Sequence, residues 1–141
     1  MAQTTTTKID NLDALYDHVR AAGKLRQRKH AERYTQAVLR TLGLYLKGGA
    51  KKSLAKALPD KLADQFTRAF FLAHFPDKTL SWSDFCKMVA RRSGNSDGQF
   101  ARIPTRAVFQ GLQALIDSDT SRKVAEALSP EVQAEWEQAR G

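Results

Sequence analysis

A gap-free internal repeat is the feature of this sequence that most constrains its fold. Residues 37–66 align with residues 107–136 at a constant offset of 70 positions. The apolar positions keep their size and register, while the polar positions differ. Packing fixes the volume and pattern of a core but leaves solvated positions free to change, so the repeat predicts that both stretches bury the same face. The repeated pairs include Leu42 with Leu112, and Phe66 with Trp136.

The repeat extends toward the N-terminus, where residues 12–19 match residues 82–89 at the same offset. Apolar residues recur at the i, i+3, i+4 spacing of amphipathic helices, and no alternating strand pattern occurs. A period of this length exceeds the roughly 20–50 residues of common solenoid repeats. We therefore expect an all-α helical bundle built from two tandem repeats of about 70 residues, with roughly eight helices. Repeat one covers 9–75 and repeat two 79–139, inside one domain of residues 9–141, preceded by a disordered tail at 1–8.

Start and stop signals place the expected helices along the chain. Asp10 or Asn11 caps the first helix and Gly23 ends it, while Gly48-Gly49 ends the second helix. Pro104 is expected to open the sixth helix, after a loop at 93–99. The expected helical ranges are 11–22, 31–47, 50–58, 59–75, 82–92, 104–116 and 130–139, with Asp117 and Asp119 capping the helix that follows 116.

Composition limits the compartment and the covalent chemistry of the chain. Cys86 is the one cysteine among 141 residues, so an internal disulfide is excluded and a buried thiol is expected. No run of 18 apolar residues occurs, and the first residues lack an apolar signal core. These features predict a cytoplasmic protein without membrane insertion.

Positive charge is concentrated in the first half of the chain. The net charge is +8, and residues 1–70 hold 14 Lys and Arg against six Asp and Glu, whereas residues 71–141 hold nine of each. Between Lys24 and Lys56 there are ten basic residues and one acidic residue, Glu32. Charge of one sign in one region is an argument about partners rather than about the fold.

The basic residues of the first repeat form the candidate surface for an acidic partner. Lys51, Lys52 and Lys56 are expected to point outward from a short helix. At the second-repeat positions that match Lys47, Lys51 and Lys56, the chain has Asp117, Ser121 and Glu126, so only the first repeat is cationic there. The candidate surface comprises Lys24, Arg26, Arg28, Lys29, Arg33, Lys47, Lys51, Lys52 and Lys56.

Three interpretations of this basic region stay open. An acidic protein surface is the expected partner, which makes the chain a helical interaction module. Nucleic acid is the alternative partner, and it would bind with an affinity that falls steeply with salt. No arginine-rich recognition helix or pair of stacking aromatic residues supports that alternative. The basic face could also serve solubility alone. The sequence gives no indication of oligomeric state.

No pattern in the sequence indicates a reaction. His18, His30 and His74 lack a Cys, His or carboxylate at metal-ligand spacing, and Asn95 to Gly98 is an incomplete calcium loop that we interpret as a turn. Phosphate-binding and nucleophile motifs do not occur. We assign no catalytic residue, no cofactor and no metal ligand. The remaining alternative is an enzyme or small-ligand carrier with an apolar pocket between the repeats, on which polar groups converge.

The stretch AVLRTLGLYLKGGAKKSLAKALP at residues 37–59 has a recognisable form. A long helix ends in a Leu-rich turn, and a short helix closing with Ala-x-Ala-Leu-Pro follows. This pattern resembles the bacterial "domain of unknown function 2267" family, which carries two such halves, each preceded by a helix such as LDALYDHV or SDFCKMVA here. The second half departs from it by having Leu128-Ser129-Pro130 in place of Leu-Pro, and the first half is more basic than the family pattern. The resemblance implies an all-helical fold and implies no activity.

Overall fold

Helices make up nearly all of the part of the chain that the computed structural model describes, which is residues 9–46, 48–67, 79–94 and 97–139. Within these ranges there are eight helices and no strand, so the predicted all-α fold is confirmed. The helices are α1 (Leu12–Ala22), α2 (Arg28–Tyr45), α3 (Gly48–Ala57), α4 (Asp60–Thr67), α5 (Trp82–Ser93), α6 (Gly98–Leu115), α7 (Ser118–Ala127) and α8 (Pro130–Ala139).

The helix bounds follow the same offset as the sequence repeat. Helices α2 and α6 begin and end 70 residues apart, as do α3 and α7, while α1 and α5 begin 70 residues apart, as do α4 and α8. The paired side chains also have equal burial, since Leu42, Leu112, Phe66 and Trp136 are all 0% exposed. The predicted tail at 1–8, the later part of the predicted fourth helix, and the division of the domain near residue 75 lie outside the described residues.

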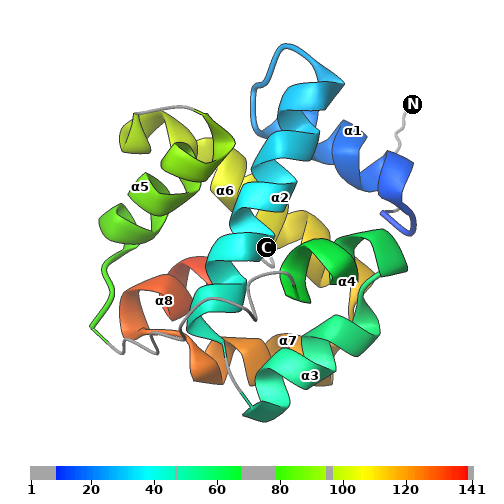
Figure 1. Ribbon diagram of the computed structural model, residues 1–141, viewed down its shortest axis with the longest axis vertical. Coiled ribbons are helices and arrows are strands. Elements are labelled where there is room, and N and C mark those ends of the chain that lie inside the picture. Colours follow the sequence, from blue (N-terminus) through cyan, green and yellow to red (C-terminus); the bar gives the residue numbers. More distant parts are fainter. Residues whose placement is uncertain (1–8, 47, 68–78, 95–96, 140–141) are drawn as a thin grey trace.

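The two sets of four helices are interleaved. Helix α1 packs against α2 of its own set and against α6 of the other, and α5 packs against α6 and against α2. The central helices α2 and α6 contact each other, and α3 contacts α7 (Figure 1). Each set therefore completes the core of the other, which suggests that neither buries its apolar faces alone.

Four aromatic rings fill the core beneath α5, α6 and α8. Trp82 stacks on Phe85 with ring centroids 5.9 Å apart, and Phe109 meets Phe85 at 5.6 Å. Phe109 also meets Trp136 edge-on at 5.0 Å. Such offset and edge-to-face pairs are favourable beyond the area they bury. All four side chains are buried.

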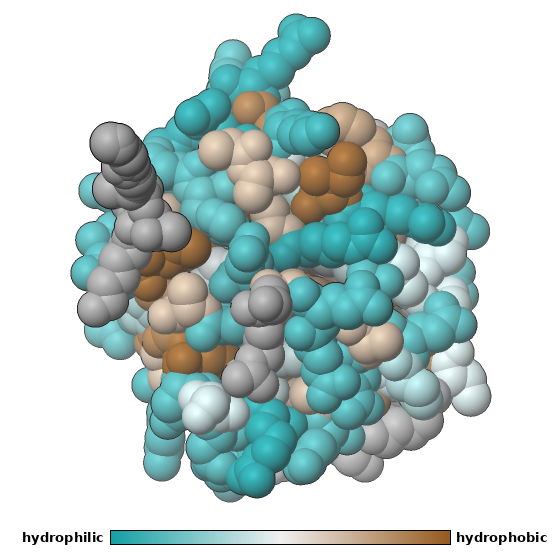
Figure 2. All heavy atoms as spheres, turned by 180° about the vertical axis from the view of Figure 1, so that it is seen from behind, coloured by the Kyte–Doolittle hydropathy of each residue, from teal (hydrophilic) through white to brown (hydrophobic). Residues whose placement is uncertain are grey.

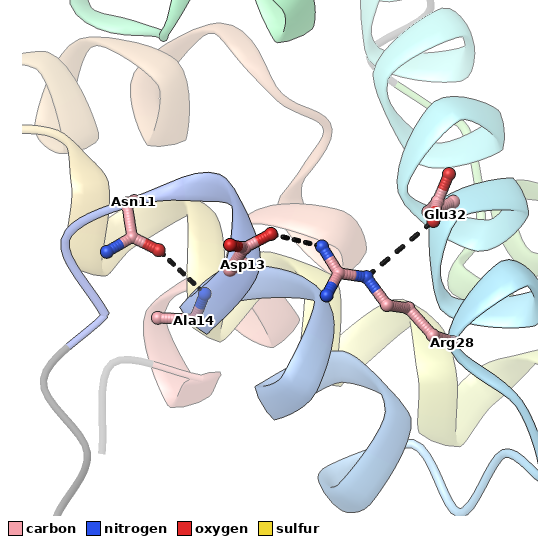
Figure 3. Close-up of polar contacts among 5 residues, drawn as sticks. All are labelled: Asn11, Asp13, Ala14, Arg28 and Glu32. Carbon is pink, nitrogen blue, oxygen red and sulfur yellow. Dashed lines mark hydrogen bonds and ion pairs between the residues drawn. The ribbon is translucent and has the colours of Figure 1, made fainter.

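Helix α1 begins and ends where the sequence predicts. The Asn11 side chain accepts a hydrogen bond from the Ala14 amide at 2.9 Å (Figure 3). Gly23 ends the helix with a φ of −82°, and the residue with a left-handed backbone is its neighbour Lys24, at 57°. Glycine is needed at position 23 because a Cβ there would lie 2.4 Å from the Val19 oxygen and 3.2 Å from Pro104 Cα. This close approach holds the α1–α2 connection against α6.

Three predicted boundaries are wrong. Helix α6 begins at Gly98, where Asp97 caps it, so Pro104 lies inside the helix rather than at its start. Pro104 has no amide hydrogen, so α6 lacks the intrahelical hydrogen bond that an amide at this position would donate to the Phe100 carbonyl. Helix α2 begins at Arg28 rather than at residue 31. Gly48 does take a left-handed backbone, with φ +62°, but it begins α3 instead of ending α2.

Candidate functional site

A hollow of about 470 Å³ lies where the α1–α2 connection and the start of α2 meet the end of α5 and the start of α6. Three cations of the predicted surface, Lys24, Arg26 and Arg33, line it together with His30. None of the described residues that line it is acidic. We call this feature the cationic hollow, and its remaining lining residues are Leu25, Tyr34, Ser93, Gly94 and Phe100.

Arginines of α5 extend the positive charge beside the hollow. Arg91 and Arg92 occupy the last turn of α5, directly before the lining residues Ser93 and Gly94, and both are exposed. The pKa of Arg92 is lowered by partial burial and then by repulsion from Arg40 and Arg91. Arg91, Arg92 and Arg40 therefore add positive charge on α5 and α2 near the hollow without lining it.

Arg28, at the start of α2, forms intramolecular contacts at the surface, where its side chain is 44% exposed. Its guanidinium pairs with Asp13 of α1 and, at 3.7 Å, with Glu32 one turn further along α2 (Figure 3). It also lies 5.4 Å from the centre of the Tyr16 ring. These contacts fasten the start of α2 to α1, so Arg28 positions the wall of the hollow rather than contributing a cation to it.

Lys51 is buried, and the prediction that it points outward is wrong. Its side chain is 1% exposed, its Nζ donates a hydrogen bond to the Gly43 carbonyl at 2.8 Å, and the ammonium lies 5.9 Å from the centre of the Phe66 ring. Burial lowers its pKa. The reason is helical geometry, because residues 51, 54 and 58 are spaced i, i+3, i+7 and share one face. Lys51 therefore packs beside Leu54 under α3.

The second set places different residues in the same arrangement. Ser121 matches Lys51, Gln113 matches Gly43, and Trp136 matches Phe66. The Ser121 hydroxyl donates to Gln113 Oε1 at 2.8 Å, and Trp136 Nε1 donates to the Ser121 carbonyl at 3.1 Å. A long lysine beside a glycine and a phenylalanine is thus replaced by a short serine beside a glutamine and a tryptophan. Each site keeps a polar contact between its short helix and its long helix.

The remaining predicted cations divide into two groups. Lys24, Arg26 and Arg33 lie before or near the start of α2, whereas the exposed Lys52 and Lys56 lie on α3, beyond its other end. An 18-residue helix is about 27 Å long. Figure 1 shows the α1–α2 connection and α3 at opposite ends of the protein. The predicted surface is therefore not one continuous patch. Lys29 is exposed near the start of α2, and Lys47 lies outside the described residues.

Sequence reasoning missed the contribution of the second set to this site. Phe100, from α6, lines the hollow and is 46% exposed, and Ile103, one turn later, is 44% exposed. They are the exposed large hydrophobic residues of the described ranges. From the face opposite to Figure 1, hydrophilic surface predominates and hydrophobic surface is limited to small areas (Figure 2). The sequence does contain a signal for this exposed pair, because Phe100 and Ile103 are spaced i, i+3 and lie outside the apolar stripe that α6 buries.

Several other titratable groups are partly or fully buried, cap a helix or pair within one helix. The Cys86 thiol is buried, and burial raises its pKa to about 12. Burial also lowers the pKa of His18. As predicted, Asp117 caps α7. The prediction that Asp119 also caps it is wrong, because Asp119 lies in the first turn of α7 and pairs with Arg122 and Lys123. Across the described ranges, no group of three or more His, Cys, Asp or Glu is arranged to hold a metal ion. No helix in those ranges has the length and hydropathy to span a membrane.

These features define an all-α protein of eight described helices, in two interleaved sets, with a cationic hollow between them. The chain belongs to the DUF2267 family, described as "Uncharacterized conserved protein", whose model matches residues 12–134. No curated protein and no solved structure matches the chain.

Proposed function

We propose that this protein is a non-enzymatic interaction module that binds an acidic partner at the cationic hollow. The observation that carries the proposal is the convergence of Lys24, Arg26 and Arg33 on one concave site without a carboxylate among its described lining residues. The volume, about 470 Å³, falls in the range of roughly 300–1,000 Å³ that is usual for ligand sites. A concave site excludes more water around a bound group than a flat face, and this strengthens each charge contact.

An acidic protein segment fits this site better than nucleic acid does. Single-stranded nucleic acid is usually held by a positively charged groove with several aromatic side chains on which successive bases stack. Phe100 is the exposed aromatic side chain that lines the hollow, because Tyr34 is 4% exposed. The cations of α3 are a helix length away and do not extend the hollow into a continuous groove. Nucleic acid and a small anion are therefore outcomes that the experiment below must separate from a peptide.

The proposal includes a cytoplasmic location. What supports it is that Cys86, the one cysteine of the chain, is a buried free thiol, so the fold does not depend on an oxidising compartment.

Fluorescence anisotropy with a labelled peptide of Asp and Glu tests the proposal. The same titration is run with mixed-sequence DNA and RNA oligonucleotides and with inorganic phosphate as competitor, at about 50 and 200 mM salt, the range over which phosphate contacts lose most of their affinity. We expect binding of the peptide that weakens with salt. If no acidic peptide binds at low salt and a nucleic acid does, the acidic-protein proposal is wrong.

Two variants with the same change in net charge locate the site. Arg26→Glu with Arg33→Glu reverses two charges of the hollow, and Lys52→Glu with Lys56→Glu reverses two charges on α3. We expect the first pair to weaken peptide binding about tenfold or more, since 1.4 kcal/mol corresponds to a factor of ten. The α3 pair should change it by less than about threefold, through long-range charge alone. Equal losses would show that net charge, and not the hollow, determines binding.

A further inference from the structure

The repeat places opposite chemistry at matching positions around the opening of the hollow. His30 and Arg33 of α2 match Phe100 and Ile103 of α6 at the 70-residue offset. Lys24, before α2, matches Gly94, before α6. The cations that line the hollow therefore come from the first set, and its exposed apolar side chain, Phe100, comes from the second set, with Ile103 one turn further along α6. Because α2 and α6 contact each other and residues of both line the hollow, these two sides face one site.

The apolar side chains Phe100 and Ile103 are exposed, unlike most other large apolar side chains of α6. Phe100 and Ile103 are 46% and 44% exposed, whereas Val108, Phe109 and Leu112 of the same helix are 0% exposed and Leu115 at its end is partly buried. Residues three apart on a helix lie about 4.5 Å apart along its axis and on the same side. Single exposed apolar residues are common, but here two lie one turn apart on α6 and one of them, Phe100, lines the hollow.

The segment that carries this pair is held in place by its surroundings. Asp97 caps α6 by accepting hydrogen bonds from the amides of Gln99 and Phe100. Gly98 allows α6 to approach α5, because a Cβ there would lie 2.8 Å from Lys87 Cγ. Pro104 follows Ile103 and packs against Gly23. A rigid, exposed apolar pair loses little conformational entropy when a partner covers it.

Ile103 also extends the apolar side beyond the hollow. It lines a second hollow of about 340 Å³ with Ala22 at the end of α1 and with Ala107 and Arg106 of α6. Arg106 is paired there with Glu135 at 2.7 Å. The lining of the second hollow is thus partly apolar, and the positive charge of Arg106 in it is paired with Glu135.

We infer that the occupant of the hollow is a short acidic protein segment with one large apolar side chain, its carboxylates held by Lys24, Arg26 and Arg33 and its apolar side chain packed on Phe100 and Ile103. This inference rests on the proposed function and adds the apolar anchor to it. Charge complementarity selects the acidic residues. The exposed pair selects the anchor, because an acidic segment without one would leave Phe100 and Ile103 uncovered. A nucleic acid would use Phe100 for stacking but would gain little from an aliphatic Ile103.

Two labelled peptides test the inference with the intact protein. One is a short run of Asp and Glu with a central Phe, and the other has Ser in place of that Phe. We expect the Phe peptide to bind about tenfold more tightly, which corresponds to part of the roughly 1.5–3 kcal/mol for complete burial of such a side chain. Equal affinity of the two peptides would overturn the apolar anchor while leaving the proposed function intact. Absence of binding by either would overturn both.

The variant Phe100→Ser with Ile103→Ser locates the anchor. Both side chains are nearly half exposed, so the substitutions should preserve the fold, which circular dichroism and a urea melt verify. We expect this variant to lose about fivefold or more of its affinity for the Phe peptide and to bind the Ser peptide as the wild type does. If both peptides lose affinity equally, the pair does not contact the anchor. If single-stranded DNA binds and is the ligand that responds to the variant, the occupant is a nucleic acid.

Discussion

Substitution of Lys51 gives the sharpest test of how the first helix set is built. Its side chain is 1% exposed, and its Nζ bonds the Gly43 carbonyl at 2.8 Å beside the Phe66 ring. In Lys51→Glu, a carboxylate would face a carbonyl oxygen and the negative face of the ring instead. A buried charge without a fitting partner costs about 3–5 kcal/mol. We therefore expect a loss of at least about 3 kcal/mol, which is a large part of the 5–15 kcal/mol typical of a small domain.

Lys52→Glu is the matched control, with the same change of charge one residue later. Lys52 is exposed on the outer side of α3, and surface substitutions usually change stability by less than about 0.5 kcal/mol. Urea unfolding followed by circular dichroism measures both variants. Equal and small effects would show that the Lys51 side chain is solvated, and the account of the contact under α3 would then be wrong. Since Lys51 is buried, a charge-reversal variant that includes it would lose stability, and any loss of binding by that variant could not be assigned to the surface.

The stability of the wild type should also show the lowered pKa of Lys51. Burial lowers the pKa of this group in the folded state below its ordinary value of 10.5. Between those two pKa values the unfolded chain binds more protons than the folded chain, so the free energy of unfolding rises with pH through this window. Lys51→Met keeps the aliphatic stem and removes the titration. The difference in unfolding free energy between wild type and Lys51→Met should therefore shift in favour of the wild type as pH approaches 10.5, and a constant difference would contradict the assignment.

Three further predictions follow from single residues. Lys24→Gly should raise the unfolding free energy by about 0.5–1 kcal/mol, because glycine removes the strain of a left-handed backbone; a urea midpoint that falls would contradict this. Gly23→Ala should cost about 1–3 kcal/mol through overlap with backbone atoms, whereas Gly49→Ala, whose Cβ meets nothing within 4 Å, should leave stability unchanged or slightly higher. The Cys86 thiol, with a pKa of about 12, should react with a thiol reagent at pH 8 only as fast as the protein unfolds; rapid reaction under native conditions would show that it is accessible.

The sequence predicts the helices well because their signals are local. Apolar spacing and the caps at Asn11 and Asp117 are properties of a few adjacent residues, and the structure confirms both caps. The start of α6 was missed because Pro104 is a strong start signal, while the true cap, Asp97, lies in a stretch rich in Gly, Ser and Asn that is typical of a loop. A local rule cannot decide between two start signals of similar strength.

The position of Lys51 was predictable in principle. Its i, i+3, i+7 spacing with Leu54 and Leu58 places it on the buried face, but the charge suggested an outward orientation. The matching residue, Ser121, is also buried. From the first set to the second, the smaller Ser121 replaces Lys51 while the larger Trp136 replaces Phe66, so the two changes compensate in volume inside the protein. When a polar residue and a core residue differ together between the two repeats, the polar residue is expected to be buried, even if it is charged.

The hollow could not be predicted from the sequence, because it depends on how the two sets assemble. The pattern of a 70-residue repeat fits two separate bundles as well as interleaved ones. Only the packing of α1 on α6 and of α5 on α2 brings residues 24–34 to the same site as Gly94 and Phe100. The net charge of each half of the sequence also gave no sign of the hollow. The second half is neutral as a whole, although Arg91 and Arg92 lie at the end of α5, next to the lining residues Ser93 and Gly94.

The most direct test of the central claim is a map of amide chemical shifts in the ¹⁵N-labelled protein during titration with the acidic peptide that contains Phe. An occupant held by cations of the first set and by the apolar pair of the second should shift the amides of residues 24–34 together with those around Gly94, Phe100 and Ile103. The amides around Lys52 and Lys56 on α3 should stay in place. Shifts centred on α3, or spread evenly over the protein, would contradict binding at the hollow.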